Sequence, residues 1–309
     1  AGGYINYYYY GYALFASVTR LTGVIPSVAF NLAVPTCFAL LVLNTWAFVA
    51  NALHALLRLT GGRASRIAPL ALGLLGPLFV AVIGNLDLAR EIGHGDYGYP
   101  PSSGAFGAAG DIVRGVFRAL FHHRPLPSDS YWAASRVIDG TINEFPYWTM
   151  LFADFHPHLI ALPFTAGALV MALGILLAKR WPEPPPESAA TSEAETGTGW
   201  RARIAHWPKT DVWDRLLLTG VAALVTGTLF PLNTWDFPTY VAITAGAFFL
   251  LELLPFLREQ GEPAKWDFSF DAIRRAALWT AGVVVGGRLL FWPYFAHYET
   301  PNSGFDKWT

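Results

Sequence analysis

Long apolar stretches, separated by polar and basic segments, dominate the chain. Six of them have the roughly 17 to 25 residues that an α-helix needs to cross the hydrocarbon of a bilayer. They are residues 27–50, 67–84, 159–178, 216–232, 237–257 and 276–296. Their Gly, Pro, Ser and Thr content is typical of membrane helices that pack against one another. The pattern therefore predicts an all-α fold, a polytopic transmembrane helix bundle.

Two further segments favour helices that lie along the membrane surface. Residues 4–22 contain Asn6, Tyr12 and the run Tyr7 to Tyr10, and tyrosine prefers the membrane interface. Residues 108–122 repeat apolar side chains at the i, i+4 and i+8 positions, so they form one apolar face. We expect both helices on the outer face of the bundle.

We expect one membrane domain, and the apolar stretches divide the chain into consecutive parts. These are an interfacial helix (1–26), two spans (27–87), an outer loop with the amphipathic helix (88–157), a third span (158–179), a flexible cytoplasmic loop (180–212), three spans (213–296) and an outer tail (297–309). The chain begins without an initiator Met. We therefore expect a fragment of a longer protein whose N- and C-terminal parts are missing here.

Composition and charge restrict the class and the orientation. The chain is 53% hydrophobic and 14% charged, which fits an integral membrane protein in contact with lipid. No basic patch with interleaved aromatic residues indicates a nucleic-acid partner. Thirteen of the 21 basic residues lie in loops on one side of the six spans, so this side is predicted to be cytoplasmic. We expect a plasma-membrane protein.

Three polar motifs lie beside apolar stretches, all on the predicted outer side. They cover residues 143–148, 154–158 and 233–238. Ionisable groups at this depth are costly, so they indicate function. Antiparallel helices would bring the motifs together in one outward polar cavity, with Glu144, Asp154 and Asp236 as candidate catalytic acids.

The residues around these acids have a functional and a structural interpretation. Asp154, His156 and His158 suit a divalent metal or acid–base work, because Pro157 would break the helix and extended backbone would point both imidazoles the same way. Alternatively they cap the following helix. Asn233, Trp235 and Asp236 either bind substrate or form a tight turn. Glu144 could instead be incidental to an aromatic membrane anchor.

Four other side chains are candidates for binding substrate. Asn6 and Tyr8 lie in the tyrosine-rich opening, whose alternative role is to anchor the chain at the interface. Arg136 and Arg288 could pair with a phosphate group. The alternative for Arg288 is that its long side chain reaches out to the membrane surface.

The motifs resemble a known family. Residues 3–11 (GYINYYYYG), 142–146 with 151–158, and 233–239 together resemble the functionally uncharacterised YYY-motif polytopic membrane proteins, which are grouped with the GT-C membrane glycosyltransferases. The resemblance implies a GT-C-like enzyme that takes a sugar from a polyprenyl-phosphate donor at the extracytoplasmic face. GT-C enzymes usually carry their catalytic Asp in the first outer loop, before this chain begins, so no base is carried over.

A transporter or a membrane assembly subunit is the second functional hypothesis. A transporter should carry ionisable groups near the middle of the membrane. Here they gather at one end, which favours surface chemistry, and Glu252 lies near enough to the cytoplasmic end to reach water. The sugar and its acceptor cannot be read from the residues.

Overall fold

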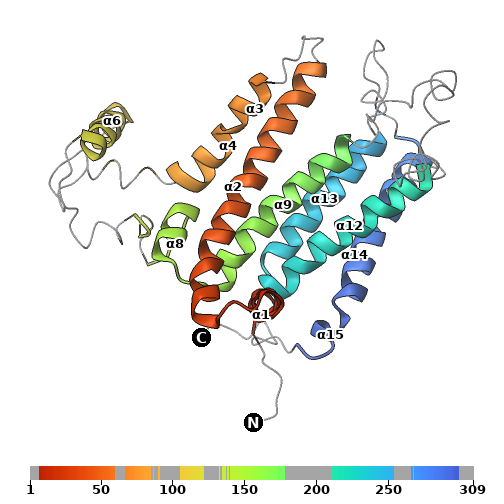
Figure 1. Ribbon diagram of the computed structural model, residues 1–309. Helices are drawn as coiled ribbons and strands as arrows, with labels where there is room; N and C mark the ends of the chain where they lie inside the picture. The colour runs from red at the N-terminus through yellow and green to blue at the C-terminus, as the bar shows by residue number, and fades with distance from the viewer. Residues whose placement is uncertain are drawn as a thin grey trace, which may run out of the picture. The chain divides into compact units, whose positions relative to one another are not determined.

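The computed structural model describes residues 7–59, 67–84, 86, 90, 105–121, 132, 134–136, 138, 140–177, 211–253, 266 and 268–298. Within these residues every regular element is a helix, so the predicted all-helical class is confirmed (Figure 1). The elements in chain order are α1 (Tyr10–Thr22), α2 (Pro26–Leu59), α3 (Ile67–Gly73), α4 (Leu75–Pro77), the π-helix η1 (Leu78–Ile83), α6 (Ala105–Phe121), α8 (Pro146–Phe152), α9 (Pro157–Leu177), α12 (Asp211–Leu232), α13 (Asp236–Leu253), α14 (Phe270–Leu290) and α15 (Trp292–Phe295).

Four helices are long and apolar enough to cross a membrane, among the residues that the structure describes. They cover Pro26–Leu57, Pro157–Leu177, Trp213–Leu232 and Asp236–Leu253. These agree with four of the six predicted spans. A polytopic helical membrane protein is therefore confirmed.

The other two predicted spans differ from the expectation for physical reasons. The stretch Ile67–Ile83 is shorter and divides into α3, α4 and η1. Pro69, Gly73, Gly76 and Pro77 disfavour a continuous α-helix there. Helix α14 has 21 residues, but Asp271, Arg274, Arg275 and Arg288 make it more charged than a typical spanning helix.

The chain divides into two compact units, described separately here. Unit 1 comprises Ala1–Ala13 and Phe164–Thr309, and unit 2 comprises Leu14–Pro163. Helix α9 begins in unit 2 and ends in unit 1. The expectation of a single membrane domain stays a prediction.

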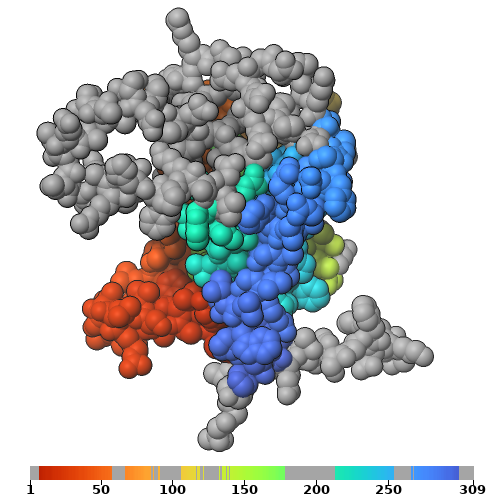
Figure 2. All heavy atoms as spheres, turned by 90° about the vertical axis from the view of Figure 1, so that its right-hand side faces the viewer, coloured from red at the N-terminus to blue at the C-terminus, as the bar shows by residue number. Residues whose placement is uncertain are grey.

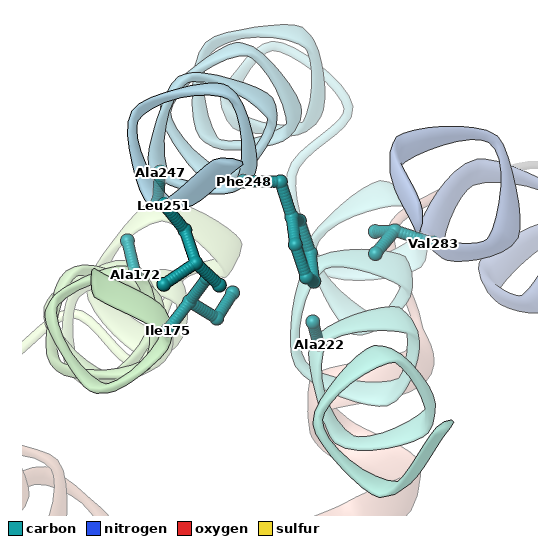
Figure 3. Close-up of a cluster of buried hydrophobic side chains, with 7 residues drawn as sticks. All are labelled: Ala172, Ile175, Ala222, Ala247, Phe248, Leu251 and Val283. Carbon is teal, nitrogen blue, oxygen red and sulfur yellow. The ribbon is translucent and has the colours of Figure 1, made fainter. Parts of the chain in front are cut away.

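The core of unit 1 lies among α9, α12, α13 and α14. Figure 3 shows Phe248 of α13 between Ala222 of α12 and Val283 of α14, while Ile175 of α9 packs beside Leu251. Many large apolar side chains on the same helices are exposed, among them Leu217, Leu250 and Leu289. This distribution suits a bundle whose outer surface contacts lipid.

Small residues bring α12 and α14 into close contact. A Cβ atom added at Gly282 would lie 2.9 Å from Thr219 Cγ2, and one added at Gly286 would lie 3.0 Å from Ala223 Cβ. A third such position, Gly227, faces Gly287 across the interface. Figure 2 shows the two helices, green-cyan and blue, lying against each other. This small-residue seam is the usual way in which membrane helices approach closely.

Unit 2 is built on α2, which packs against α3 and α4 (Figure 1). Trp46 of α2 donates a hydrogen bond from Nε1 to the carbonyl oxygen of Leu70, at 2.9 Å. The predicted surface helices correspond to α1 and α6, with slightly different ends. The π-helix η1 packs against α8, which positions the first polar motif.

Candidate functional site

Glu144 and His158 form the closest acid–imidazole pair among the described residues. Nε2 of His158 lies 2.6 Å from Oε2 of Glu144. Glu144 precedes α8 by two residues, and His158 is the second residue of α9. The side chains are 31% and 39% exposed, so the pair is open to a substrate. A contact this short between a carboxylate and an imidazole is a strong, oriented hydrogen bond.

Two neighbours hold Glu144 in place. The hydroxyl of Thr149, on α8, donates to the same Oε2 atom at 3.3 Å. The adjacent ring of Phe145 lies against Gly84 at the end of η1, where an added Cβ would be 3.0 Å from the ring. Gly84 has a φ of 46°, a backbone conformation that would be strained in a residue with a side chain. The end of the π-helix therefore sets the position of the motif that carries Glu144.

A second acid–imidazole pair lies next to the first. Nδ1 of His156 is 3.2 Å from Oδ2 of Asp154, and the ring centroids of His156 and His158 are 5.3 Å apart. Ala153, which ends α8, has a left-handed φ of 57°, an uncommon conformation for a residue with a side chain. Strain of this kind is often found beside functional residues.

An aromatic anchor fixes the same segment. Phe155 is buried and makes edge-to-face contacts with Phe15 and Phe30, at centroid distances of 4.9 and 5.6 Å. The apolar ring therefore points inward, while its polar neighbours Asp154 and His156 stay accessible.

The role predicted for Pro157 was wrong. We expected Pro157 to keep the backbone extended, but it is the first residue of α9, where proline is well tolerated. The two imidazoles come close because His156 precedes the helix and His158 lies in its first turn. In the described part of the chain, Asp154 pairs with His156 rather than with a backbone N–H group of α9, which gives the capping alternative no support for this residue.

The acids and imidazoles form pairs instead of converging on one point. Among the described residues, no set of three or more His, Cys, Asp or Glu side chains is arranged to hold a metal ion. The divalent metal predicted at Asp154, His156 and His158 stays a prediction. The two pairs themselves can accept and donate protons, as acid–base chemistry requires.

Arg136 lies in unit 2, as does the Glu144–His158 pair. Its Nη1 donates to the Ser135 hydroxyl at 2.6 Å, and its guanidinium lies 5.5 Å from the centroid of the Trp132 ring. Asn143 shapes the intervening loop, because its Oδ1 accepts hydrogen bonds from Ile138 N and from the Thr141 hydroxyl. Asn143 is therefore a structural member of its motif.

In unit 1, residues 233–235 form the tight turn between α12 and α13. Asp236 is the first residue of α13, and its Oδ2 accepts a hydrogen bond from Asn233 Nδ2 at 3.0 Å. Trp235 is 82% exposed at the tip of the turn. Arg288 is also exposed, with its guanidinium 3.9 Å from the Phe295 ring centroid. The structure thus confirms that this segment forms a tight turn, while substrate binding by these residues stays a prediction.

A tyrosine cluster in unit 1 was not predicted from the sequence. Tyr294 is buried between Tyr9 and Tyr298, with centroid distances of 5.7 and 5.0 Å. Burial, and after it the neighbouring Tyr8, raise the pKa of the Tyr298 hydroxyl. The only sequence feature that could have indicated this cluster is composition, since the segments around Tyr9 and Tyr294 are both rich in aromatic residues. The cluster gives Tyr8 a place in a packed aromatic group, while Asn6 lies outside the described residues.

The candidate residues are distributed over both units. Glu144, Asp154, His156, His158 and Arg136 belong to unit 2, and Tyr8, Asn233, Trp235, Asp236 and Arg288 belong to unit 1. Their meeting in one outward cavity stays a prediction. The two acid–imidazole pairs of unit 2 are the part of the predicted site that the structure brings together.

Comparison with known proteins agrees with the membrane fold. Neither the curated proteins nor the solved structures gave a match. A model of a membrane protein family described as uncharacterized matches the whole chain, residues 1–309. The chain therefore belongs to the family of uncharacterized membrane proteins known as DUF2298.

Proposed function

We propose that the protein is an integral-membrane glycosyltransferase that uses a polyprenyl-phosphate-linked sugar at the extracytoplasmic face. The observation that supports this most is the 2.6 Å contact between Glu144 Oε2 and His158 Nε2 in a partly exposed position. Transfer of a sugar to a hydroxyl group needs a base at the membrane surface, and this pair supplies one. The resemblance of the three motifs to GT-C-related proteins points to the same reaction class.

The pair acts by taking a proton from the acceptor. Glu144 orients the imidazole of His158 through Nε2, which leaves the other ring nitrogen to receive the proton of the acceptor hydroxyl. The acceptor oxygen then bonds to the anomeric carbon of the sugar. The bond between that carbon and the phosphate oxygen breaks, and polyprenyl phosphate departs with the bonding electrons.

Arg136 is our candidate for stabilising the departing phosphate. It carries a permanent positive charge in the same unit as the pair, and the Trp132 ring and Ser135 orient its guanidinium. Asp154 and His156 are our candidates for holding His158 and binding acceptor hydroxyl groups, since the two imidazole rings lie beside each other. No step in this scheme requires a metal.

The test is an assay of sugar transfer with membranes that contain the full-length protein. A panel of labelled polyprenyl-phosphate sugars serves as donors, and release of polyprenyl phosphate is measured. We expect Glu144→Gln and His158→Gln each to lower the rate about 100-fold or more, because the first removes the carboxylate that orients the imidazole and the second removes the base itself. Asp271→Asn, which removes an exposed acid of α14, should leave the rate within about twofold.

Failure of every donor, or equal rates for the Glu144→Gln variant and the parent protein, would refute the proposal. Protein abundance in the membrane is measured for each variant. A loss of rate that only follows a loss of protein would indicate a structural role for the pair and would also count against the proposal.

The second candidate function, transport, is supported by polar side chains buried inside the helix bundle of unit 1. Glu252 does not reach water as expected, because its side chain is fully buried among α12, α13 and α14. Two further side chains in the same bundle, Thr219 and Thr244, have buried hydroxyls with no hydrogen-bond partner among the described residues. Buried polar groups between helices are typical of transport paths. The test is uptake of a solute into vesicles that contain the protein. Uptake that Thr244→Val abolishes and Glu144→Gln leaves intact would favour transport over sugar transfer.

A further inference from the structure

The three helices α12, α13 and α14 enclose an unbalanced group of charges in unit 1. Glu252 of α13 pairs through Oε1 with Nη1 of Arg215 from α12, and its Oε2 accepts a hydrogen bond from Nε of Arg275 on α14, at 3.0 Å. One buried carboxylate thus faces two guanidinium groups. These three residues, called the Arg–Glu–Arg triad below, carry a formal net charge of +1 when counted by themselves.

Two acids among the described residues near the triad, Asp271 and Asp214, do not remove this excess. Arg274, next to Arg275, is compensated by Asp271, whose Oδ1 lies 3.3 Å from its Nη2. Asp214 is exposed and directly precedes Arg215 in α12, and adjacent residues of a helix do not face each other. An excess positive charge next to a low-dielectric interior is unfavourable in free energy, so binding of an anion that pairs with it would be favourable.

The guanidinium groups have donors left to bind such an anion. Within the described part of the chain, Arg275 uses only Nε and Arg215 uses only Nη1. Arg275 is 40% exposed, so its two Nη groups reach the surface of the bundle. Arg215 is held by the Trp279 ring, at 5.8 Å from the centroid. Two oriented guanidinium groups are well suited to the oxygens of a phosphate.

The surroundings place this anion at the depth of lipid headgroups. Exposed aromatic side chains surround the same end of the bundle: Trp213 at the start of α12, and Trp266, Phe268 and Phe270 before and at the start of α14. The rings of Trp266 and Phe268 are stacked, with centroids 5.7 Å apart. Tryptophan collects where hydrocarbon meets headgroups. A lipid phosphodiester carries a single negative charge, which matches the excess of the triad.

We infer that Arg215 and Arg275 bind the phosphate of an anionic membrane phospholipid at the end of unit 1 opposite to the turn at residues 233–235. Glu252 positions both guanidinium groups and offsets one of their two positive charges. The inference does not depend on the proposed glycosyltransferase function.

The experiment measures lipid affinity of the purified protein in detergent by thermal stabilisation. Phosphatidylglycerol, phosphatidylcholine and inorganic phosphate are each titrated. We expect phosphatidylglycerol to raise the melting temperature saturably and phosphatidylcholine to do so much less. Arg275→Gln should weaken the phosphatidylglycerol affinity about tenfold or more, since it removes charge-assisted hydrogen bonds. Arg274→Gln, an equal loss of charge one residue away, should keep the affinity within about threefold.

Glu252→Gln is the second variant, in case Arg275→Gln does not fold. It removes the competing carboxylate and keeps both arginines, so phosphatidylglycerol should bind more tightly than to the parent protein. Equal binding of the two lipids, equal losses in the two arginine variants, or weaker binding to Glu252→Gln would overturn the inference. Stabilisation by inorganic phosphate alone, at the same concentrations, would overturn the assignment to a lipid.

Discussion

A Cβ atom placed on Gly227 would lie 2.8 Å from the Cα atom of Gly287. The two glycines therefore mark a close approach of α12 and α14 within unit 1, where an added Cβ would meet the backbone of Gly287 as well as the ring of Phe291.

Replacement of Gly227 by Ala should consequently destabilise the protein by about 1 to 3 kcal/mol, because the added methyl group forces the helices apart. Gly220 lies on the same helix with no atom within 4 Å of an added Cβ, so Gly220→Ala is the matched control. The control should be neutral or slightly stabilising, since alanine favours a helix. Thermal unfolding of the two variants in detergent measures the difference in stability. Equal melting temperatures would show that α12 and α14 do not need a glycine at position 227 to pack together.

Gly84→Ala should disturb the candidate site through its contact with Phe145. The substitution strains the positive φ of residue 84 and pushes the ring of Phe145, which precedes α8 beside Glu144. We expect the activity carried by Glu144 to fall, together with a loss of stability of about 1 to 2 kcal/mol.

Gly140→Ala separates the two effects. Gly140 also has a positive φ, 74°, but no atom lies within 4 Å of an added Cβ. Its substitution should cost similar stability and leave activity unchanged. Equal loss of activity in both variants would show that contact with Phe145 is not what positions Glu144.

The sequence predicted the four spans well because their apolar character is local and continuous. It failed where local signals conflict with packing. Pro77 and the glycines near it break the second predicted span into short helices, and the charges of α14 are accommodated by neighbours such as Glu252. The burial of Glu252 depends on Arg215 and Arg275, which lie far away in the chain. Such partnerships cannot be read from periodicity.

The candidate site shows the same division. Residue chemistry identified Glu144 and His158 separately, but it grouped His158 with Asp154 as metal ligands. The pairing with Glu144 follows from the turn at Ala153, whose backbone is left-handed. A local sequence pattern predicts this conformation for glycine or asparagine but not for alanine. The tyrosine cluster was missed because Tyr294 and Tyr298 lie far along the chain from Tyr8 and Tyr9.

The Tyr298 hydroxyl should make the stability of unit 1 depend on alkaline pH. Burial raises its pKa above 10, the ordinary value for tyrosine. The unfolded chain therefore releases this proton first, so the contribution to stability is complete below about pH 10 and is lost as the pH rises towards the folded-state pKa. We expect the melting temperature to fall less between pH 9 and pH 11 in Tyr298→Phe than in the parent protein. An identical fall in both proteins would refute this role, and Tyr147→Phe controls for the loss of a hydroxyl.

The predicted orientation can be tested with single cysteines in unit 1. Trp235 and Phe270 are both exposed and lie at opposite ends of the bundle, and the native Cys37 is buried. In intact cells, an impermeant thiol reagent should label Trp235→Cys and should label Phe270→Cys only after the membrane is permeabilised. The reverse pattern would show that the turn at residues 233–235 faces the cytoplasm.

We propose that the Glu144–His158 pair works on a polyprenyl-phosphate substrate. An experimental structure of the full-length protein with bound polyprenyl phosphate tests it most directly. We predict that the phosphate lies beside the pair, with the Arg136 guanidinium turned towards its oxygens. A phosphate bound elsewhere, with Glu144 and His158 out of contact with the ligand, would contradict the account.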